Sequence, residues 1–293
     1  MLKQIILECR PRQWTKNLLL FAGVLFTGRL QDPASIGRAV AAFVIFCALS
    51  SVVYIINDLK DLDSDRQHPV KRHRPLASGD LPVGAAVLTA AVLTPAALIL
   101  SFLINTSFGC YALAYFILLT LYSFHLKHVV ILDIMLVAVG FVIRAIAGIE
   151  VLRGIGGPLE ITSWFIVCAL FLSLFLAICK RRNELVLLNA NAGRHRRVLE
   201  EYSEQFLDQM MAVATTGTIL TYALWSVQGK FHGMIYTLPF VVFGIFRYLY
   251  LVYKRDQGGA PEIILLTDRP LQVNIVLWLA TTVGILYGHL SFS

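Results

Sequence analysis

Residues 39–66, AVAAFVIFCALSSVVYIINDLKDLDSDR, change character partway along. The apolar first part carries no charged residue. We expect it to belong to a transmembrane helix over residues 36–57, because a helix needs about 20 apolar residues to cross the hydrocarbon of a bilayer. The second part then places four aspartates, Asp58, Asp61, Asp63 and Asp65, within eight positions. The stretch predicts a membrane protein with carboxylates where a helix leaves the bilayer.

The composition extends this prediction to the whole chain. Of the 293 residues, 57% are hydrophobic and only 15% are charged, whereas soluble domains carry about 25% charged residues. Helices are the expected form of such apolar runs in lipid, and no alternation with a period of two suggests a barrel. We predict one all-α domain over residues 1–293, with nine transmembrane helices. The predicted spans are 17–31, 36–57, 82–104, 108–125, 129–150, 162–179, 209–228, 233–252 and 271–290.

Lysine and arginine predict the orientation of these spans. The N-terminus and the connections after the second, fourth, sixth and eighth spans hold nineteen of the 25 basic residues. The other side holds only Arg29, Arg38, Arg153 and Lys230. Because cytoplasmic loops are enriched in Lys and Arg, we expect the N-terminus and the polar loops in the cytoplasm and the C-terminus outside, in the plasma (inner) membrane.

The net charge of +7 suits lipid headgroups or phosphorylated substrates. Nucleic acid is excluded as a partner, because the basic residues lie in short connections between apolar spans and not on one domain. The five cysteines have no spacing typical of a metal site or a disulfide framework. A homo-oligomer is left open.

The acidic stretch predicts a magnesium site. Asn57, Asp61 and Asp65 are spaced i, i+4 and i+8, so they would share one face if the helix continued past the membrane edge. Mg²⁺ prefers a few carboxylate oxygens and completes its shell with water and phosphate. An ordinary solvated acidic loop is the alternative.

A basic cluster follows the carboxylates and favours the magnesium interpretation. Lys71, Arg72 and Arg74 come within ten residues of Asp65 and are followed by PLASG. A metal together with nearby cations is what a diphosphate needs, because the metal takes two oxygens and the cations take the others.

These residues carry a family resemblance. NDLKDLDSDR followed by KRHRPLASG resembles the first aspartate-rich motif of the UbiA superfamily of intramembrane prenyltransferases. The resemblance implies a helical bundle around a central cavity that cytoplasmic loops cap. Asn57, Asp61 and Asp65 would then be the Mg²⁺ ligands, with Asp58 as a further acceptor.

The second half departs from the general pattern of the superfamily. Most members carry paired aspartates after the sixth span, whereas this chain reads KRRNEL over 180–185, with Glu184 as its one acidic residue. Together with RPRQWTKN (10–17), KRHRP (71–75), LKH (126–128), IRAIAG (143–148) and LEEY (199–202), this resembles the decaprenyl-phosphate phosphoribosyltransferase branch. That branch implies phosphoribosyl pyrophosphate as the donor and a polyprenyl monophosphate as the acceptor.

The resemblance assigns roles to individual residues. Asp61, Asp65 and Glu184 are expected to be catalytic. The expected substrate-binding residues are Arg12, Lys16, Asp58, Lys71, Arg72, Arg74, Lys127, Arg144, Lys180, Arg181 and Tyr202.

Several of these residues have simpler alternatives. Arg12 and Lys16 lie four residues apart and are expected to share one helical face at the start of a span. The alternative is that basic residues collect at any cytoplasmic helix end. Lys127 could simply lay its stem along apolar surface and keep its ammonium group in water, without binding substrate. Lys180 and Glu184 could pair with each other. Arg144 lies among apolar residues and needs a phosphate or an acidic partner.

The predicted activity is Mg²⁺-dependent transfer of 5-phosphoribose to the lipid phosphate, with release of pyrophosphate. Two alternatives remain. One is a conventional prenyltransferase that moves an isoprenoid from its diphosphate to an aromatic acceptor, which the absence of paired aspartates disfavours. The other is a transporter or channel, since intramembrane charges also mark transport paths.

Overall fold

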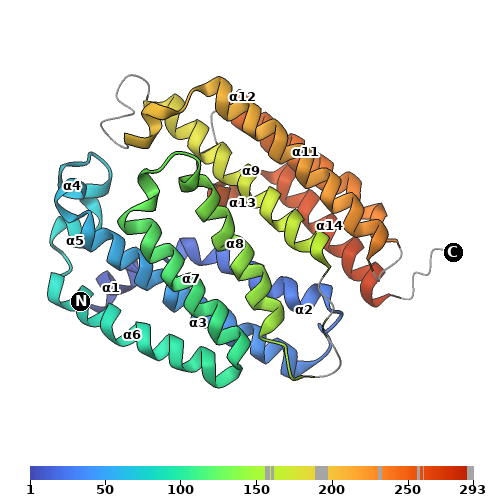
Figure 1. Ribbon diagram of the computed structural model, residues 1–293, viewed down its shortest axis with the longest axis horizontal. Helices are drawn as coiled ribbons and strands as arrows, with labels where there is room; N and C mark the ends of the chain where they lie inside the picture. The colour runs from blue at the N-terminus through green and yellow to red at the C-terminus, as the bar shows by residue number, and fades with distance from the viewer. Residues whose placement is uncertain are drawn as a thin grey trace. The chain divides into compact units, whose positions relative to one another are not determined.

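The computed structural model describes residues 1–155, 159, 162–188, 197–229, 233–255, 258–259 and 261–288. Within these ranges all regular structure is helical, as Figure 1 shows. The N-terminal half contains α1 (Leu2–Glu8), η1 (Pro11–Phe21), α2 (Ala22–Phe26), α3 (Pro33–Lys60), α4 (Leu62–Gln67), η2 (Lys71–His73), α5 (Pro75–Ser78), α6 (Val83–Ile104), α7 (Thr106–Phe124), η3 (Leu126–His128) and α8 (Leu132–Glu150). The C-terminal half contains α9 (Ser163–Leu188), η5 (Arg197–Glu201), α11 (Glu204–Gln228), η6 (Met234–Thr237), α12 (Leu238–Arg255), α13 (Pro261–Thr267) and α14 (Arg269–Tyr287).

Eight of the described helices are long and apolar enough to cross a membrane. They are α3, α6, α7, α8, α9, α11, α12 (with η6) and α14. Each coincides with a predicted span, although the last prediction ran to residue 290, beyond the described range. Lys230, counted in the predicted charge asymmetry, also lies outside the described residues.

The predicted first span, 17–31, is not among these eight helices. The chain instead forms η1 and α2, which together cover Pro11–Phe26, with Pro11 at the first helical position. A 3-10 helix rises about 2.0 Å per residue against about 1.5 Å in an α-helix, so the whole segment is roughly 30 Å long. The segment Pro11–Phe26 has fewer residues than a typical transmembrane helix, but its length is close to the thickness of the bilayer hydrocarbon. The count of nine spans stays a prediction.

The described chain divides into two compact units. Unit 1 contains Met1–Lys127 and Ile143–Leu159, and unit 2 contains His128–Val142 and Glu160–Ser293. Helix α8 therefore begins in unit 2 and ends in unit 1. The single domain predicted over residues 1–293 stays a prediction.

Unit 1 is built on α3, with α6 and α7 beside it (Figure 1). Phe46 of α3 contacts Tyr115 and Phe108 of α7, with ring centroids 5.1 and 5.8 Å apart. The close backbone approach of α2 to α8 depends on two glycines. A Cβ on Gly23 would lie 1.9 Å from the carbonyl oxygen of Gly148, so only glycine fits there.

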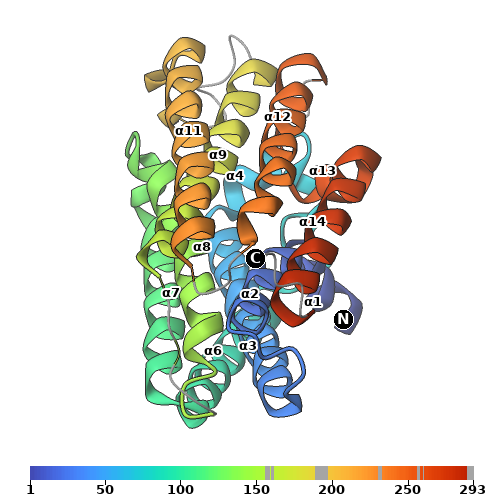
Figure 2. The same ribbon diagram turned by 90° about the vertical axis from the view of Figure 1, so that its right-hand side faces the viewer.

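Unit 2 pairs α9 with α11 and α12 with α14, and Figure 2 shows both pairs. Its core includes Phe175 of α9, which meets Tyr248 of α12 edge-on at 5.5 Å. Gly217 of α11 lets the ring of Phe171 approach closely, because a Cβ there would lie 2.5 Å from the ring. Helix α9 thereby gains a fixed position against α11.

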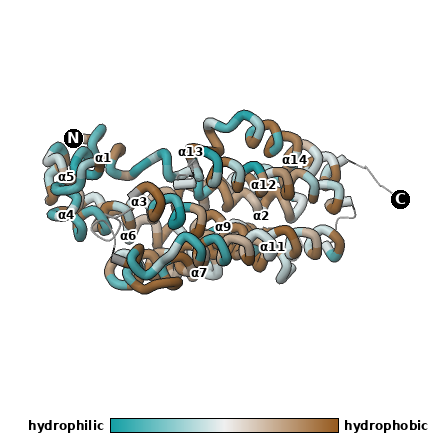
Figure 3. The backbone as a smooth tube through the Cα atoms, turned by 90° about the horizontal axis from the view of Figure 1, so that it is seen from above, coloured by the Kyte–Doolittle hydropathy of each residue, from teal (hydrophilic) through white to brown (hydrophobic). Residues whose placement is uncertain are grey.

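Two local features place the functional side chains. Helix α3 ends at Lys60 and α4 begins at Leu62. The single helix that would place Asn57, Asp61 and Asp65 on one face is therefore interrupted at Asp61. The amide of Asp61 nevertheless bonds the carbonyl of Asn57 at 2.9 Å, and that of Asp65 bonds Asp61 at 2.8 Å. Helix α4, with the sequence LDSDRQ, is mainly hydrophilic (Figure 3).

The second feature is the length of α9. The polar connection predicted from residue 180 instead continues the helix as far as Leu188. The side chains of Arg181 and Glu184 form an i, i+3 ion pair on it, which supports the extra turns. Residues 180–185 are thus held on a rigid helix.

Candidate active site

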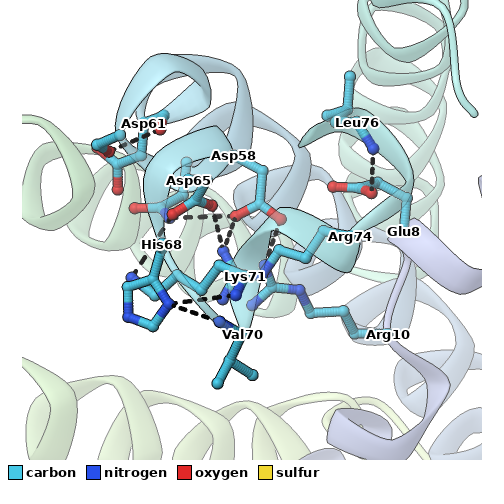
Figure 4. Close-up of polar contacts among 12 residues, drawn as sticks. Glu8, Arg10, Asp58, Asp61, Asp65, His68, Val70, Lys71, Arg74 and Leu76 are labelled. Atoms are coloured by element: carbon cyan, nitrogen blue, oxygen red, sulfur yellow. Dashed lines mark hydrogen bonds and ion pairs between the residues drawn. The ribbon is translucent and has the colours of Figure 1, made fainter. Parts of the chain in front are cut away.

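The first group of functional side chains gathers in unit 1 and is called here the first cluster. It comprises Glu8, Asn57, Asp58, Asp61 and Asp65 with the cations Arg10, Lys71, Arg74 and Lys127 (Figure 4 shows most of them). These residues come from α1, α3, α4, η2, η3 and the turns beside them. Segments up to about 120 residues apart in the chain thus supply one polar centre.

Each aspartate of the motif except the exposed Asp63 is paired with a cation of the cluster. Arg74 lies between two carboxylates, with Nη1 3.0 Å from Oδ1 of Asp58 and 2.5 Å from Oδ2 of Asp65. Arg10 also pairs with Asp58, and the Lys71 ammonium lies 3.6 Å from Asp65. Asp58 and Asp65 are buried, and a buried carboxylate is tolerated only when it is paired.

Asp61 has a partner from farther along the chain. The Nζ atom of Lys127 lies 2.7 Å from Oδ2 of Asp61 and 3.3 Å from Oδ1 of Asn57. Lys127 therefore contacts two of the three predicted metal ligands at once. The structure brings this lysine to the carboxylates, and its binding of substrate stays a prediction.

The turn before the cations is fixed by His68. Its Nδ1 atom accepts the backbone N–H groups of Val70 and Lys71 at 3.1 and 3.2 Å, as Figure 4 shows. The basic residues of η2 begin directly after this turn. Of these, Arg72 is exposed and lies beside His73, with 3.4 Å between Nε and Nε2.

The donor set fits a hard cation, although the side chains are not gathered around one. Two carboxylates and one amide oxygen are the ligand types that Mg²⁺ prefers. Among the described residues no three His, Cys, Asp or Glu side chains are placed to hold a metal together. The reason is visible in the contacts, since Lys127 holds Asp61 while Arg74 and Lys71 hold Asp65.

Glu8 is a member of the cluster that sequence reasoning missed. It is 1% exposed and accepts the backbone N–H of Leu76 at 3.3 Å. Burial, followed by the neighbouring carboxyl of Asp58, raises the pKa of Glu8 to about 7. Arg10 was also missed, although it stands at the start of the RPRQWTKN motif. An isolated acidic residue in a short helix carries no periodic signal that would have singled out Glu8.

Arg12 and Lys16 do not share a face as predicted. The prediction assumed an α-helix, in which residues four apart nearly align. In the 3-10 helix η1, with three residues per turn, they point about 120° apart. Arg12 is exposed and Lys16 is partly buried.

Arg144 is buried in the half of α8 that belongs to unit 1. Its Nε donates to Oδ1 of Asn17 at 2.8 Å, and its Nη2 donates to the hydroxyl of Tyr115 at 2.5 Å. The guanidinium also lies 4.6 Å from the centroid of the Tyr115 ring. These contacts are with neutral groups, whereas the sequence led us to expect a phosphate or an acidic partner.

The second cluster lies in unit 2 and comprises Asp133, Arg181, Glu184 and Tyr202. Arg181 uses one Nη atom for Glu184 and the other for Asp133, at 2.8 Å in the latter case. The Tyr202 hydroxyl donates to Asp133 at 2.7 Å and accepts the N–H of Ile131 at 2.7 Å. Burial and then the bond to Asp133 raise the pKa of Tyr202.

These contacts bear on three predicted roles. Glu184 pairs with Arg181 on α9, and Lys180 is exposed on the same helix. Tyr202 gives its one hydroxyl proton to Asp133, so donation to a phosphate would require that bond to open. Asp133 itself was not predicted as a site residue, because a lone aspartate in the first turn of a helix is also an ordinary helix-stabilising feature.

Comparison with known proteins identifies the family. The UbiA prenyltransferase family model matches residues 18–267. The chain is 36% identical to decaprenyl-phosphate phosphoribosyltransferase of Corynebacterium glutamicum, over 97% of this chain and 86% of that protein. It is 35% identical to the enzyme of the same name from Mycolicibacterium smegmatis, over 97% of this chain and 92% of that protein.

Solved structures show the same fold. A UbiA homologue from Archaeoglobus fulgidus bound to DMAPP and Mg²⁺ is 21% identical with a TM-score of 0.75, covering 97% of this chain and 99% of that one. The same homologue bound to GPP and Mg²⁺ has a TM-score of 0.74 at the same identity and coverage. The resemblance found in the sequence motifs is confirmed, and the chain is a membrane protein that belongs to the UbiA prenyltransferase family.

Proposed function

We propose that this protein transfers 5-phosphoribose from phosphoribosyl pyrophosphate to a polyprenyl monophosphate of the decaprenyl type and releases pyrophosphate. The names of the relatives that are about a third identical support this reaction. The structural observation that carries it is the second cluster. Where most of the superfamily carries paired aspartates, α9 presents Arg181 held by Asp133 and Glu184.

The balance of charges supports a donor rich in phosphate. Phosphoribosyl pyrophosphate carries a diphosphate and a separate phosphate, and the lipid acceptor adds a third phosphate group. One divalent metal cannot neutralise all of them, so fixed cations are required. Arginine forks and lysine ammonium groups are the side chains that match phosphate oxygens.

The first cluster would bind the diphosphate of the donor. Asn57, Asp61 and Asp65 would hold Mg²⁺, which supplies charge neutralisation to the diphosphate and to the pyrophosphate that leaves. Lys127 now neutralises Asp61, and Arg74 neutralises Asp65. When the metal binds these two carboxylates, both cations would become available to phosphate oxygens. Asp58 keeps Arg10 and Arg74 in place, because it is buried against both.

Further residues are assigned by chemistry. Arg181 and Lys180 would take phosphate oxygens, and Glu184, which is 28% exposed, would hold a ribose hydroxyl. Lys71, Arg72, Arg12 and Lys16 would add positive charge on the donor side. Arg144 would act within the apolar part of unit 1, where its bonds to Asn17 and Tyr115 fix the guanidinium.

The reaction needs little acid–base chemistry. A phosphate oxygen of the lipid is already an anion, so it can attack C1 of the ribose while pyrophosphate leaves, with inversion at C1. The residues of the chain hold two anions that would otherwise repel each other, and they stabilise the charge that develops on the leaving group. No strong general base is required.

The lipid and the bilayer complete the proposal. The polyprenyl chain would lie in a central cavity of a nine-helix bundle or pass sideways into the membrane. The site would open to the cytoplasm, with the N-terminus on that side and the C-terminus outside, in the plasma membrane. The asymmetry of lysine and arginine supports this orientation.

A direct comparison of donors tests the proposed function. Protein purified into lipid nanodiscs with Mg²⁺ receives either phosphoribosyl pyrophosphate with a polyprenyl phosphate or a prenyl diphosphate with an aromatic acid. We expect a charged lipid product only in the first reaction, and its loss with EDTA or in Asp61→Ala. Product only in the second reaction would show conventional prenyl transfer, the activity suggested by the fold neighbours bound to GPP and DMAPP.

A further inference from the structure

Asp133 is the most deeply buried member of the second cluster. Its side chain is 0% exposed, and that of Arg181 is 5% exposed. The two are joined at 2.8 Å, and Tyr202 adds a hydrogen bond of 2.7 Å to the same carboxylate. Asp133, near the start of α8, therefore holds both Arg181 of α9 and Tyr202, which follows η5.

The backbone just before Asp133 is held in an uncommon conformation. Ile131 has a φ of 69°, which lies in the left-handed region that a β-branched residue rarely adopts. Such a conformation is unfavourable and persists only where the surroundings impose it. Here the N–H of Ile131 donates to the hydroxyl of Tyr202, so the tyrosine links the strained turn to the carboxylate.

The two acidic partners of Arg181 differ in exposure, and this difference suggests different roles. Glu184 is 28% exposed and pairs with Nη1, whereas Asp133 is fully buried and pairs with Nη2. An anion that arrives from solvent can displace the exposed carboxylate far more readily than the buried one. One arm of the guanidinium can thus exchange its partner while the other arm stays fixed.

The neighbouring arginine provides an internal comparison. Arg182 also meets an aspartate and a tyrosine, with Asp208 2.6 Å from its Nε and Tyr253 donating to the same carboxylate at 2.8 Å. Asp208 is 36% exposed. The chemistry of the two groups matches, but only the Asp133 group is sealed from solvent.

We propose that Asp133 is a positioning residue, which together with Tyr202 holds one arm of Arg181 so that the other arm can exchange Glu184 for a phosphate of the donor. This inference rests on the proposed function and refines it. It assigns Tyr202 to positioning and not to direct contact with phosphate. Asp133 acts through Arg181 and touches no substrate.

The test compares Asp133→Asn with Asp208→Asn, in the wild type and in an Arg181→Gln background. We expect Asp133→Asn to raise the KM for phosphoribosyl pyrophosphate about tenfold or more and to change kcat little, because the loss of one charge from a buried ion pair leaves Arg181 without its fixed partner. Asp208→Asn should leave this KM within about twofold, because its exposed pair contributes little. In the Arg181→Gln background, Asp133→Asn should add less than about twofold, since coupled residues are not additive.

A second variant covers the case in which Asp133→Asn does not fold. Tyr202→Phe removes only the hydroxyl and leaves the Asp133–Arg181 pair intact, and it should raise the same KM by about threefold. An unchanged KM in the folded variants, or equal losses with and without Arg181, would overturn the inference. A wild type that transfers no phosphoribose and binds no labelled donor in equilibrium dialysis would refute the proposed function as well as the inference.

Discussion

Lys127→Met should separate metal binding from donor binding in the first cluster. The ammonium of Lys127 lies 2.7 Å from Asp61 and 3.3 Å from Asn57, which are two of the three proposed Mg²⁺ ligands. A metal that binds these oxygens must first displace the lysine. We therefore expect the substitution to strengthen metal binding in the absence of substrate and to weaken donor binding.

The size of the effect follows from the geometry. Two unit charges at 2.7 Å attract by about 6 kcal/mol at an effective dielectric constant of about 20. Both side chains are partly exposed, 14% for Lys127 and 25% for Asp61, and the net value of such pairs is about 1 kcal/mol. Removal of this competition should raise the affinity for Mg²⁺ about fivefold. Loss of a charged contact to the diphosphate should lower donor affinity about tenfold.

Calorimetric titration with Mg²⁺, or Mn²⁺ titration followed by electron paramagnetic resonance, measures the first effect. Titration of the donor at saturating metal measures the second. Lys60→Met is a matched control, because Lys60 bonds the carbonyl of Ser123 at 3.2 Å and pairs with no carboxylate of the first cluster. Metal affinity that is unchanged or weaker in Lys127→Met, or equally raised in Lys60→Met, would refute the reasoning.

Two further predictions concern stability. Burial raises the pKa of Glu8 from its ordinary value of 4.5 to about 7, so the folded state binds more protons than the unfolded state between these two values. The free energy of unfolding should therefore fall by on the order of 3 kcal/mol as the pH rises through this window. Glu8→Gln should remove this decline, which thermal unfolding near pH 5 and pH 8 measures; equal pH dependence in both proteins would contradict the assignment. Gly148→Ala should destabilise the protein by about 3 kcal/mol or more, because a Cβ would lie 2.2 Å from the carbonyl oxygen of Leu20, whereas Gly37→Ala meets nothing within 4 Å. Similar unfolding temperatures for the two glycine variants would show that the close backbone packing is absent.

The membrane helices could be predicted from the sequence because each long apolar run has one stable form in lipid. The segment Pro11–Phe26 could not, since hydropathy does not distinguish a 3-10 helix from an α-helix. The extension of α9 to Leu188 was also missed, because hydropathy does not show whether a charged segment is helical. A charged sequence such as KRRNEL reads as a connection, although its residues are good helix formers.

The members of the candidate site that belong to a sequence motif could be predicted. Those brought to the site only by tertiary contacts could not. Asp61 and Asp65 were singled out by their spacing and Lys127 by the family resemblance, and the structure places all three in the first cluster. Their roles there stay predictions. Glu8 and Asp133 are single carboxylates without periodic or motif signal, and only packing against distant segments buries them. The pairing of Asp61 with a lysine 66 residues away likewise depends on the fold.

The central claim is that the ribose 5-phosphate group, and not an isoprenoid, moves to the acceptor. The most direct measurement uses phosphoribosyl pyrophosphate labelled either on the 5-phosphate or on the diphosphate, with an unlabelled polyprenyl phosphate and the purified protein. We predict that the label on the 5-phosphate enters the lipid product and that the label on the diphosphate is released as pyrophosphate. Diphosphate label in the lipid, or no label in the lipid from either donor, would contradict the proposed function.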